Sequence, residues 1–258
     1  MQTSGNPFKQ ALAERRTQIG LWCSLCSNLA AEVIAGAGFD WLLIDMEHAP
    51  TELTTLVGQL QAMSGGTATP VVRPQWNDMV QIKRILDAGA NSLLVPYVQN
   101  ADEARAAVAA TRYPPQGVRG VASIHRGNRF ARDKGYTQRA NSEICVMVQV
   151  ETTTALDHLE AIAAVEGVDA VFIGPSDLAA SLGHLGNASH LEVRSTIESA
   201  LKRIHAAGKP SAILTAVEAD ARLWLECGAT AVAVGSDLSL LSRQSEELAS
   251  RFKAIKPA

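Results

Sequence analysis

The sequence predicts an α/β protein of the (β/α)8, or TIM-barrel, class, and three observations lead to that expectation. Eight short apolar segments recur along the 258 residues, and each is followed by a stretch with the apolar spacing of a helix. The apolar segments are nearly continuous rather than alternating, which indicates burial on both faces and therefore parallel pairing. A doubly wound open sheet is the alternative, but it usually has fewer strands. We therefore expect a single barrel domain over residues 1–258.

The expected strands and helices alternate from the first apolar segment to the last helix. Glycines such as Gly38, Gly89 and Gly208 follow helical stretches and precede strands, as glycines at helix C-termini do. We expect strands at residues 19–25, 41–47, 69–73, 92–98, 145–151, 170–174, 211–215 and 231–235. Helices are expected at about 28–37, 51–63, 77–88, 101–111, 153–165, 190–207, 217–226 and 238–254.

One long segment, residues about 112–144, interrupts this alternation after the fourth strand. It begins Arg-Tyr-Pro-Pro-Gln-Gly-Val-Arg-Gly and continues as a polar, arginine-rich stretch. A plain loop of this length is uncommon in a compact domain. On a barrel we expect it to overhang the C-terminal face, as a lid or as a contact between subunits.

The composition excludes several classes of function. The formal net charge is −3, and the sequence has no basic stripe for nucleic acid. No apolar run approaches the roughly 18 residues of a membrane span. The first residues also lack the charged-then-apolar pattern of a signal peptide. We expect a cytoplasmic protein that binds neither nucleic acid nor membrane.

Cysteine and lysine positions narrow the chemistry. Cys23 and Cys26 match C-x-x-C, but residues three apart on a strand face opposite sides, and no second pair completes a zinc site. We therefore expect free thiols. The lysines avoid strands and strand ends, which excludes the desolvated lysine of a Schiff-base mechanism. Any carbanion chemistry would then require a metal ion.

Two carboxylates, Glu151 and Asp177, end apolar segments that lie one helix apart in the sequence. A carboxylate at the end of a buried strand is costly to desolvate unless it has a cation or a metal as partner. Hard oxygen ligands of this kind suit Mg²⁺ or Mn²⁺. The alternatives are ion pairs with Arg73 or capping of the following helices. Period-two alternation places Gln149 on the same face as Glu151.

The second and third strands end in further charged residues. Arg73 carries a planar donor fork that suits a carboxylate or an oxyanion, although pairing with Asp45 or Glu47 is the alternative. His48 is the one histidine at an expected strand end, where a neutral imidazole suits acid–base work. The other histidines fall on helices or loops and are expected to be solvated: His125, His158, His184, His190 and His205.

Seven segments occur in order and with few gaps between about residue 20 and residue 252: IDMEHAP, VVRP, LVP, RYPPQGVRG, VQVE, IGPSDL and VAVG. Together they resemble the metal-dependent class II pyruvate aldolases of the HpcH/HpaI family, a group that includes 4-hydroxy-2-oxoheptanedioate and 2-dehydro-3-deoxyglucarate aldolases. One such segment alone would be a weak signal, whereas seven in register are specific.

The resemblance implies a metal site and a pyruvate site. Glu151 and Asp177 would ligate a divalent ion, Mg²⁺, Mn²⁺ or Co²⁺, with the carboxylate and keto oxygens of pyruvate completing its shell. Arg73 would contact the keto or enolate oxygen, and Gln149 would support the same site. The pyruvate carboxylate would be held by backbone N–H groups of the turn that contains Gly174, Pro175 and Ser176.

The resemblance also implies the groups for proton transfer and for the aldehyde. His48, paired with Asp87, would transfer the proton, with Asp45 nearby. Leu214 would line the aldehyde side. Ser176 stands where several members of the family have alanine. Family members are often hexamers that exchange their C-terminal helix, which residues 238–254 would do here.

The implied reaction is cleavage of a 4-hydroxy-2-oxo acid into pyruvate and an aldehyde, or the reverse addition, through the pyruvate enolate. Succinic semialdehyde, tartronate semialdehyde, glyceraldehyde-type and glycolaldehyde acceptors all fit, so aromatic and sugar-acid breakdown both stay open. One alternative is an acyl-CoA lyase of the citramalyl or malyl-CoA type, for which the arginines of residues 126–139 would hold the CoA phosphates. Another is an inactive oxo-acid-binding barrel.

Overall fold

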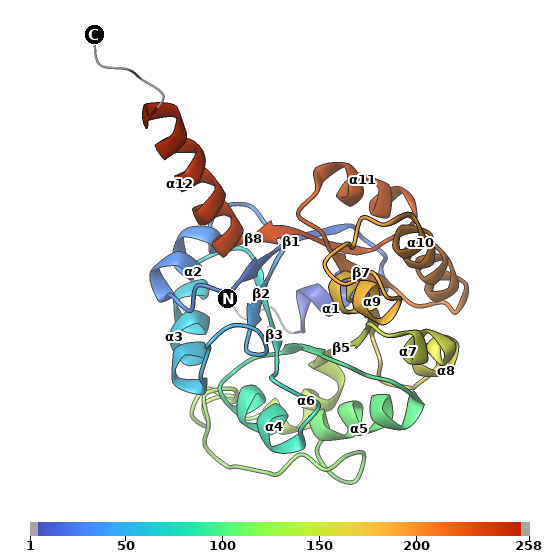
Figure 1. Cartoon of the computed structure of the whole chain (residues 1–258). Coiled ribbons are helices and arrows are strands. Elements are labelled where there is room, and N and C mark those ends of the chain that lie inside the picture. The colour runs from blue at the N-terminus through green and yellow to red at the C-terminus, as the bar shows by residue number, and fades with distance from the viewer. Residues whose placement is uncertain (1–4, 254–258) are drawn as a thin grey trace.

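The computed structural model describes residues 5–253 and contains a closed barrel of eight parallel strands (Figure 1). The strands follow chain order around the barrel, and β8 pairs with β1 to close it. The predicted (β/α)8 fold is therefore confirmed. The strands are β1 (Gln18–Cys23), β2 (Trp41–Asp45), β3 (Thr69–Arg73), β4 (Ser92–Val95), β5 (Cys145–Val150), β6 (Ala170–Ile173), β7 (Ser211–Leu214) and β8 (Ala231–Ser236).

Helices surround the barrel, and most follow the strands as the sequence predicts (Figure 1). The expected helix at 101–111 has the predicted bounds, whereas the helix expected at 153–165 is two short helices. The break falls at His158, whose φ of −105° and ψ of 11° are not helical. The helices are α1 (Pro7–Ala13), α2 (Asn28–Ala35), α3 (Leu53–Met63), α4 (Met79–Asp87), α5 (Ala101–Thr111), α6 (Tyr136–Glu143), α7 (Thr153–Asp157), α8 (Leu159–Ala163), α9 (Pro175–Ser181), α10 (Leu191–Ala206), α11 (Glu218–Glu226) and α12 (Asp237–Lys253).

Several strands end before the apolar sequence does, which corrects the expected C-terminal ends. Glu47, Glu151 and Gly174 lie just beyond β2, β5 and β6 instead of inside them. The predicted ends were too long because an apolar run indicates which residues are buried, whereas regular strand pairing stops earlier, where the chain bends at the mouth of the barrel. The correction matters because it places these residues on the rim, where their side chains can turn inward.

Helix α1, which the sequence analysis missed, lies before β1, and its apolar residues join the core inside the barrel. Asn6 caps it by accepting a hydrogen bond from the Lys9 amide at 3.1 Å. Its buried Phe8 packs on Trp41 with the ring centroids 5.5 Å apart. A Cβ at Gly20 would lie 2.3 Å from Trp41, so glycine alone leaves room for the indole inside the barrel. The helix has only seven residues, too few for a clear periodic signal.

Residues 112–144 pack against the C-terminal end of α4, which corrects the expected overhang of the C-terminal face. Arg119 is buried, donates to Asp87 Oδ1 at 2.7 Å and to the Tyr136 hydroxyl at 3.1 Å, and lies over the ring of Tyr113. Arg126 donates to the carbonyl of residue 88 at 2.9 Å. Because each helix of such a barrel runs back from the mouth, these contacts lie toward the N-terminal ends of the strands.

Helix α12 projects away from the barrel (Figure 1). Of its residues only Asp237 is buried, where its carboxylate accepts hydrogen bonds from the amides of Ser24 at 2.8 Å and Leu25 at 3.1 Å. The rest of the helix leaves large apolar side chains exposed: Leu238, Leu240, Leu241, Leu248 and Phe252. Among the helices of residues 5–253, none is long and apolar enough to cross a membrane.

Candidate active site

A cavity of about 160 Å³ lies at the C-terminal ends of the strands, where polar side chains from several strands meet. Most of the predicted site residues line it, so the sequence located the mouth of the barrel correctly. Glu151 lies against its wall through Gln149 rather than lining it directly. The lining residues are Trp22, His48, Arg73, Gln149, Phe172, Gly174, Pro175, Ser176, Asp177 and Leu214.

Arg73 is held in place by Asp45, its direct partner in the register between β3 and β2. Arg73 Nε donates to Asp45 Oδ1 at 2.9 Å and Nη2 donates to Oδ2 at 2.7 Å, with both side chains almost fully buried. Burial would raise the pKa of Asp45, but the hydrogen bonds and charge of Arg73 outweigh it and lower that pKa. The guanidinium therefore keeps one orientation and remains charged beside the cavity.

Two further groups fix the same guanidinium. Its carbon lies 5.1 Å from the centroid of the Trp22 indole, and the indole N–H donates to Asp45 Oδ2 at 3.2 Å. Glu47 Oε2 lies 2.9 Å from Arg73 Nη1 as an ion pair. The pKa of Glu47 is nonetheless raised, because burial outweighs the attraction of Arg73. The ion pairs of Arg73 with Asp45 and Glu47, which the sequence offered as the alternative to binding a substrate anion, are thus both formed. The paired guanidinium still lines the cavity.

Glu151 is the buried carboxylate of the site. Gln149 Nε2 donates to Glu151 Oε2, and the amide of Tyr97 donates to Oε1 at 2.9 Å. The pKa of Glu151 is raised to about 7, chiefly because the carboxylate is buried; the charges of Asp177 and Glu47 act in the same direction, and the hydrogen bonds from Gln149 and Tyr97 oppose them. Glu151, Asp177 and Glu47 therefore repel one another when ionised, and a bound cation would stabilise their ionised forms.

The turn after β6 brings backbone close to that carboxylate. A Cβ at Gly174 would lie 2.5 Å from Glu151 Oε2, so the close approach requires glycine. The Gly174 amide donates to the carbonyl of Val150 at 3.1 Å, and Pro175 has no N–H. The amides that the first turn of α9 offers a ligand are therefore those of Ser176 and Asp177, a narrower set than the sequence predicted.

The donor set fits a hard divalent ion. Glu151 is buried and Asp177 is exposed at the edge of the same cavity, so one side of the site meets protein and the other meets solvent. Gln149 Oε1 is buried and has no hydrogen-bond partner among the described residues. Carboxylate and amide oxygens with water as further ligands are typical of Mg²⁺ and Mn²⁺ sites. The metal prediction thus agrees with the chemistry of the residues present.

The predicted pair of His48 and Asp87 is not formed within the described chain. His48 is exposed and lies 3.9 Å from Glu47 Oε2, whereas Asp87 pairs with Arg119 at the far end of α4. The prediction that His125 is solvated is wrong: its side chain is buried, and its Nδ1 lies 3.8 Å from Asp87 Oδ1. Burial lowers the pKa of His125 more than the Asp87 charge raises it. Sequence spacing did not reveal this contact because His125 belongs to the folded-back segment after α5.

Sequence reasoning missed two aromatic residues of the site. Trp22 and Phe172 line the cavity, and their ring centroids are 5.6 Å apart. Both belong to apolar runs, which from sequence alone indicate a buried strand and not a site. Their signal was position: each lies in the last residues of a strand, on the inward face, where a side chain reaches the mouth.

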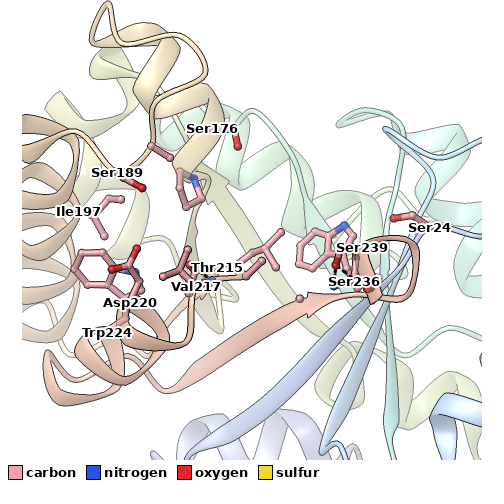
Figure 2. Close-up of a pocket in the computed structure, with 16 residues that line it drawn as sticks. Ser24, Ser176, Ser189, Ile197, Thr215, Val217, Asp220, Trp224, Ser236 and Ser239 are labelled. Atoms are coloured by element: carbon pink, nitrogen blue, oxygen red, sulfur yellow. Dashed lines mark hydrogen bonds between the residues drawn. The ribbon is translucent and has the colours of Figure 1, made fainter. Parts of the chain in front are cut away.

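A second cavity of about 370 Å³ adjoins the first (Figure 2). The two share Trp22, Pro175, Ser176 and Leu214 in their walls. The rest of the larger cavity comes from the α9–α10 loop, the segments after β1 and β7, the end of β8, and helices α10, α11 and α12. No lysine within residues 5–253 lines either cavity, which agrees with the exclusion of Schiff-base chemistry.

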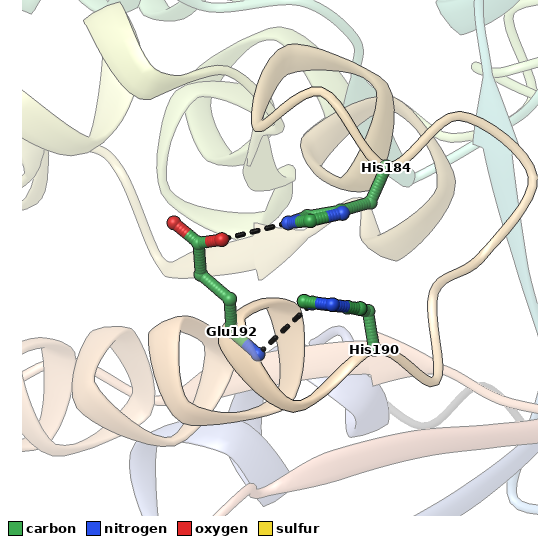
Figure 3. Close-up of side chains that lie close together, drawn as sticks. All are labelled: His184, His190 and Glu192. Carbon is green, nitrogen blue, oxygen red and sulfur yellow. Dashed lines mark hydrogen bonds and ion pairs between the residues drawn. The ribbon is translucent and has the colours of Figure 1, made fainter.

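Two histidines of the loop after α9 cluster with Glu192 in the first turn of α10 (Figure 3). The rings of His184 and His190 stack with centroids 3.6 Å apart, and His184 Nε2 lies 2.7 Å from Glu192 Oε2. Stacked rings direct their nitrogen lone pairs in nearly parallel planes, so one ion could not be bound by both without rotating a ring. His190 Nδ1 also accepts the Glu192 amide at 3.3 Å. The cluster therefore fixes the loop rather than forming a metal site.

The mouth of the closed barrel thus holds buried carboxylates, an amide side chain and a fixed arginine around a small cavity. This arrangement is typical of an enzyme that acts on small polar substrates. The model of the HpcH/HpaI aldolase/citrate lyase family matches residues 18–243, and the chain belongs to this family. A 4-hydroxy-2-oxo-heptane-1,7-dioate aldolase of Salmonella dublin is 56% identical over 97% of this chain and 96% of its own.

Solved structures agree with the family assignment. An HpcH/HpaI aldolase/citrate lyase family protein from Burkholderia cenocepacia superposes with a TM-score of 0.93 at 40% identity, covering 96% of this chain and 100% of that one. A citrate lyase beta subunit from M. tuberculosis, complexed with oxaloacetate and magnesium, has a TM-score of 0.54 and 16% identity. It covers 87% of this chain and 92% of that one, and the likeness extends to the fold alone.

Proposed function

We propose that this protein cleaves 4-hydroxy-2-oxo acids into pyruvate and an aldehyde, and catalyses the reverse aldol addition. The observation that carries the proposal is the convergence of buried Glu151, Gln149 and Arg73 beside a 160 Å³ cavity, a size suited to a three-carbon oxo acid. The 56% identity to an aldolase of a 4-hydroxy-2-oxo diacid, over nearly the whole of both chains, supports the same reaction.

Glu151 and Asp177 are the residues that would hold the divalent ion, with the orphaned Gln149 Oε1 available to the ion, a bound water or the substrate. When bound, the ion polarises the keto oxygen of the oxo acid as a Lewis acid. The residues around it bind and orient the substrate. The amides of Ser176 and Asp177 at the start of α9 are placed to hold the substrate carboxylate.

Arg73 has the electrostatic role in this proposal. In cleavage the C4 hydroxyl loses its proton, the C3–C4 bond breaks, and its electron pair moves into the C3 enolate while C4 becomes the aldehyde carbon. Negative charge then develops on the former keto oxygen. Arg73 remains cationic and is held in one orientation by Asp45, so it stabilises this charge without reorganising during the reaction.

His48 is the group we propose for proton transfer at the C4 oxygen. It lines the cavity, and its side chain is about two-thirds exposed, so it can exchange protons with solvent. Protonation of C3 then gives the methyl group of pyruvate. The role of Asp87 stays a prediction, because within one chain its carboxylate is bound by Arg119.

We also propose that the chain assembles through α12. The helix has 17 residues, projects from the barrel and exposes apolar side chains along most of its length (Figure 1). A helix of this kind gains stability only when its apolar residues pack on another surface. Docking on a second copy, with a hexamer as the expected assembly, accounts for that surface.

The acyl-CoA alternative is less well supported by the geometry. Of the arginines in the 126–139 stretch, Arg126 is bound to a carbonyl of α4, and Arg139 is paired with Asp133 and Glu143. The segment packs toward the N-terminal ends of the strands, away from the cavity. The other two, Arg129 and Arg132, line a separate cavity with Gly89 and Asn91 and not the one at the mouth, so the segment offers no cation to a CoA phosphate there within the same chain.

The test is pyruvate release from racemic 4-hydroxy-2-oxoheptanedioate. The enzyme is treated with EDTA, and Mg²⁺, Mn²⁺ or Co²⁺ is then restored, beside an Asp177→Ala control. We expect release that depends on the ion and that falls at least a hundredfold in the variant. Ion-independent release, or full activity of Asp177→Ala, would contradict the assignment of the metal ligands.

A further inference from the structure

We propose that Tyr97 is a positioning residue of the metal site: its main chain, held in a left-handed turn after β4, fixes the carboxylate of Glu151 before an ion binds. The inference rests on the proposed aldol reaction, in which Glu151 ligates the divalent ion, and it adds a residue that is not itself a ligand. Tyr97 does not line the cavity, so it acts through Glu151.

Tyr97 has a backbone conformation that its own side chain disfavours. Its φ is 55°, in the left-handed region that glycine adopts readily and that bulky residues rarely adopt. A residue held there is strained and stays there only when the surrounding structure fixes it, and such residues cluster at functional sites. The contact that this conformation makes possible is the one with Glu151.

The turn inserts one extra residue where β4 and β5 separate. The register of the two strands, continued beyond their last pair, would bring the Tyr97 amide to the Gln149 carbonyl. Instead the Val98 amide donates to that carbonyl at 3.0 Å. The Tyr97 amide is thereby released from the ladder and donates to Glu151 Oε1 at 2.9 Å. The insertion is a β-bulge, which here directs a backbone donor at a buried side chain.

The hydrogen bond from Tyr97 completes the support of this carboxylate. Gln149 Nε2 donates to Oε2, so each oxygen of Glu151 accepts one hydrogen bond from the protein. A carboxylate oxygen has two lone pairs, so each oxygen keeps one for an ion. Groups that hydrogen-bond a metal ligand fix its orientation, and their loss typically lowers metal affinity by roughly 10- to 100-fold. The Tyr97 amide is placed to have this effect.

Contacts on two sides hold the strained turn. The Tyr97 ring packs on the ring of Trp76, with the centroids 5.4 Å apart. Asn77 Nδ2 donates to a backbone carbonyl of α5 at 3.0 Å, which attaches the loop after β3, and with it Trp76, to that helix. Beyond the turn, the Gln99 amide donates to Glu103 Oε2 at 2.8 Å, also on α5. The turn is therefore fixed by protein contacts alone.

Three replacements of Tyr97 separate its backbone from its side chain. Tyr97→Gly and Tyr97→Asn remove the phenol ring but accept a positive φ, whereas Tyr97→Val removes the ring and, being β-branched, does not. Titration with Mn²⁺, followed by the electron paramagnetic resonance of the free ion, gives the dissociation constant. The number of sites from the same titration reports how much of each variant is folded.

We expect Tyr97→Val to bind Mn²⁺ at least tenfold more weakly than wild type, or about 1.4 kcal/mol, because its amide turns away from Glu151. Tyr97→Gly and Tyr97→Asn should stay within threefold of wild type. Equal dissociation constants for the valine and glycine variants, whether both are weak or both are tight, overturn the proposal.

Arg15 offers the matched control. Its φ is 52°, and it lies exposed just after α1, away from the mouth. Arg15→Val should lower the melting temperature but leave the Mn²⁺ dissociation constant within twofold of wild type. A loss of affinity as large as that of Tyr97→Val would show that strain anywhere in the chain weakens the site, and it would overturn the specific role of Tyr97.

Trp76→Ala tests the contact that holds the turn. It should weaken Mn²⁺ binding at least threefold when residue 97 is tyrosine. In the Tyr97→Gly background, where neither the ring nor the strain remains, it should have no effect. Equal effects in the two backgrounds overturn the role of the ring contact.

The wild-type titration separates this inference from the proposed function. Absence of Mn²⁺ binding by the folded wild type, or equal binding by Asp177→Ala, would contradict the assignment of the metal site itself. Binding that Asp177→Ala loses and Tyr97→Val keeps would leave the proposed function intact and overturn only the role of Tyr97.

Discussion

Replacing Asp45 with asparagine should both destabilise the protein and reduce its activity, because Asp45 holds Arg73 through two hydrogen bonds of 2.9 and 2.7 Å. The exposed fractions of the two side chains are 2% and 7%, so the pair is buried. Removing one partner of such a pair typically costs about 3–5 kcal/mol. Asparagine keeps the shape and one acceptor oxygen, so we expect about 3 kcal/mol for Asp45→Asn.

That loss converts into measurable quantities. For a chain of this size, each kcal/mol shifts the melting temperature by roughly 2–4 °C, so Asp45→Asn should melt about 6–12 °C lower. Arg73 would lose its fixed orientation beside the cavity. Because misplacing a catalytic group by about 1 Å can cost about a hundredfold, we expect kcat/KM to fall by that order.

Urea unfolding of Asp45→Asn, Arg73→Met and the double variant provides the assay, with Glu47→Gln as the matched control. Glu47 contacts the same guanidinium but is more exposed, so its replacement should cost about 1 kcal/mol. We expect the double variant to be destabilised by about 2 kcal/mol less than the sum of the single variants. Additive effects, or equal losses for Asp45→Asn and Glu47→Gln, would refute the reasoning.

Three further predictions follow from the same structure. Arg73 lowers the pKa of Asp45 in the folded protein, so the stability advantage of wild type over Asp45→Asn is full above about pH 4 and is lost as the pH falls through that lowered pKa. Urea unfolding between pH 6 and pH 2 measures the difference in unfolding free energy between the two proteins. A difference that does not change with pH would contradict the prediction. Leu241→Glu should shift sedimentation toward smaller species with unchanged circular dichroism, whereas Leu185→Glu, on a still more exposed leucine of a loop, should leave sedimentation unchanged. Phe8→Ala should cost about 3–5 kcal/mol in thermal unfolding but change kcat less than twofold, because α1 lies away from the mouth; a large loss of kcat without destabilisation would contradict that separation.

The barrel could be predicted because its elements depend on local signals. The bounds of β3 and of the helix at 101–111 were predicted without error, since an apolar run bounded by proline and glycine, or an alanine-rich amphipathic stretch, carries its own limits. The position of the mouth also followed from sequence order. Parallel strands all end at the same side, so the residues after them had to meet there.

What the sequence could not supply were contacts between distant segments. The packing of Arg119 and His125 around Asp87 requires residues 112–144 to fold back on α4, and no local pattern encodes that direction. Likewise, Trp22 and Phe172 read as ordinary core residues until the strands closed into a barrel. The larger cavity is assembled from loops after four different strands, so its hydroxyl lining had no signature in any one of them.

The central claim is that this site generates a pyruvate enolate with the help of Glu151, Asp177 and Arg73. The most direct measurement is proton NMR of the pyruvate methyl group in deuterated water, with enzyme and Mg²⁺, Mn²⁺ or Co²⁺ and no aldehyde. We predict ion-dependent loss of the methyl signal that EDTA abolishes and that Arg73→Lys slows at least tenfold. An unchanged methyl signal with every ion, from folded enzyme, would contradict the account.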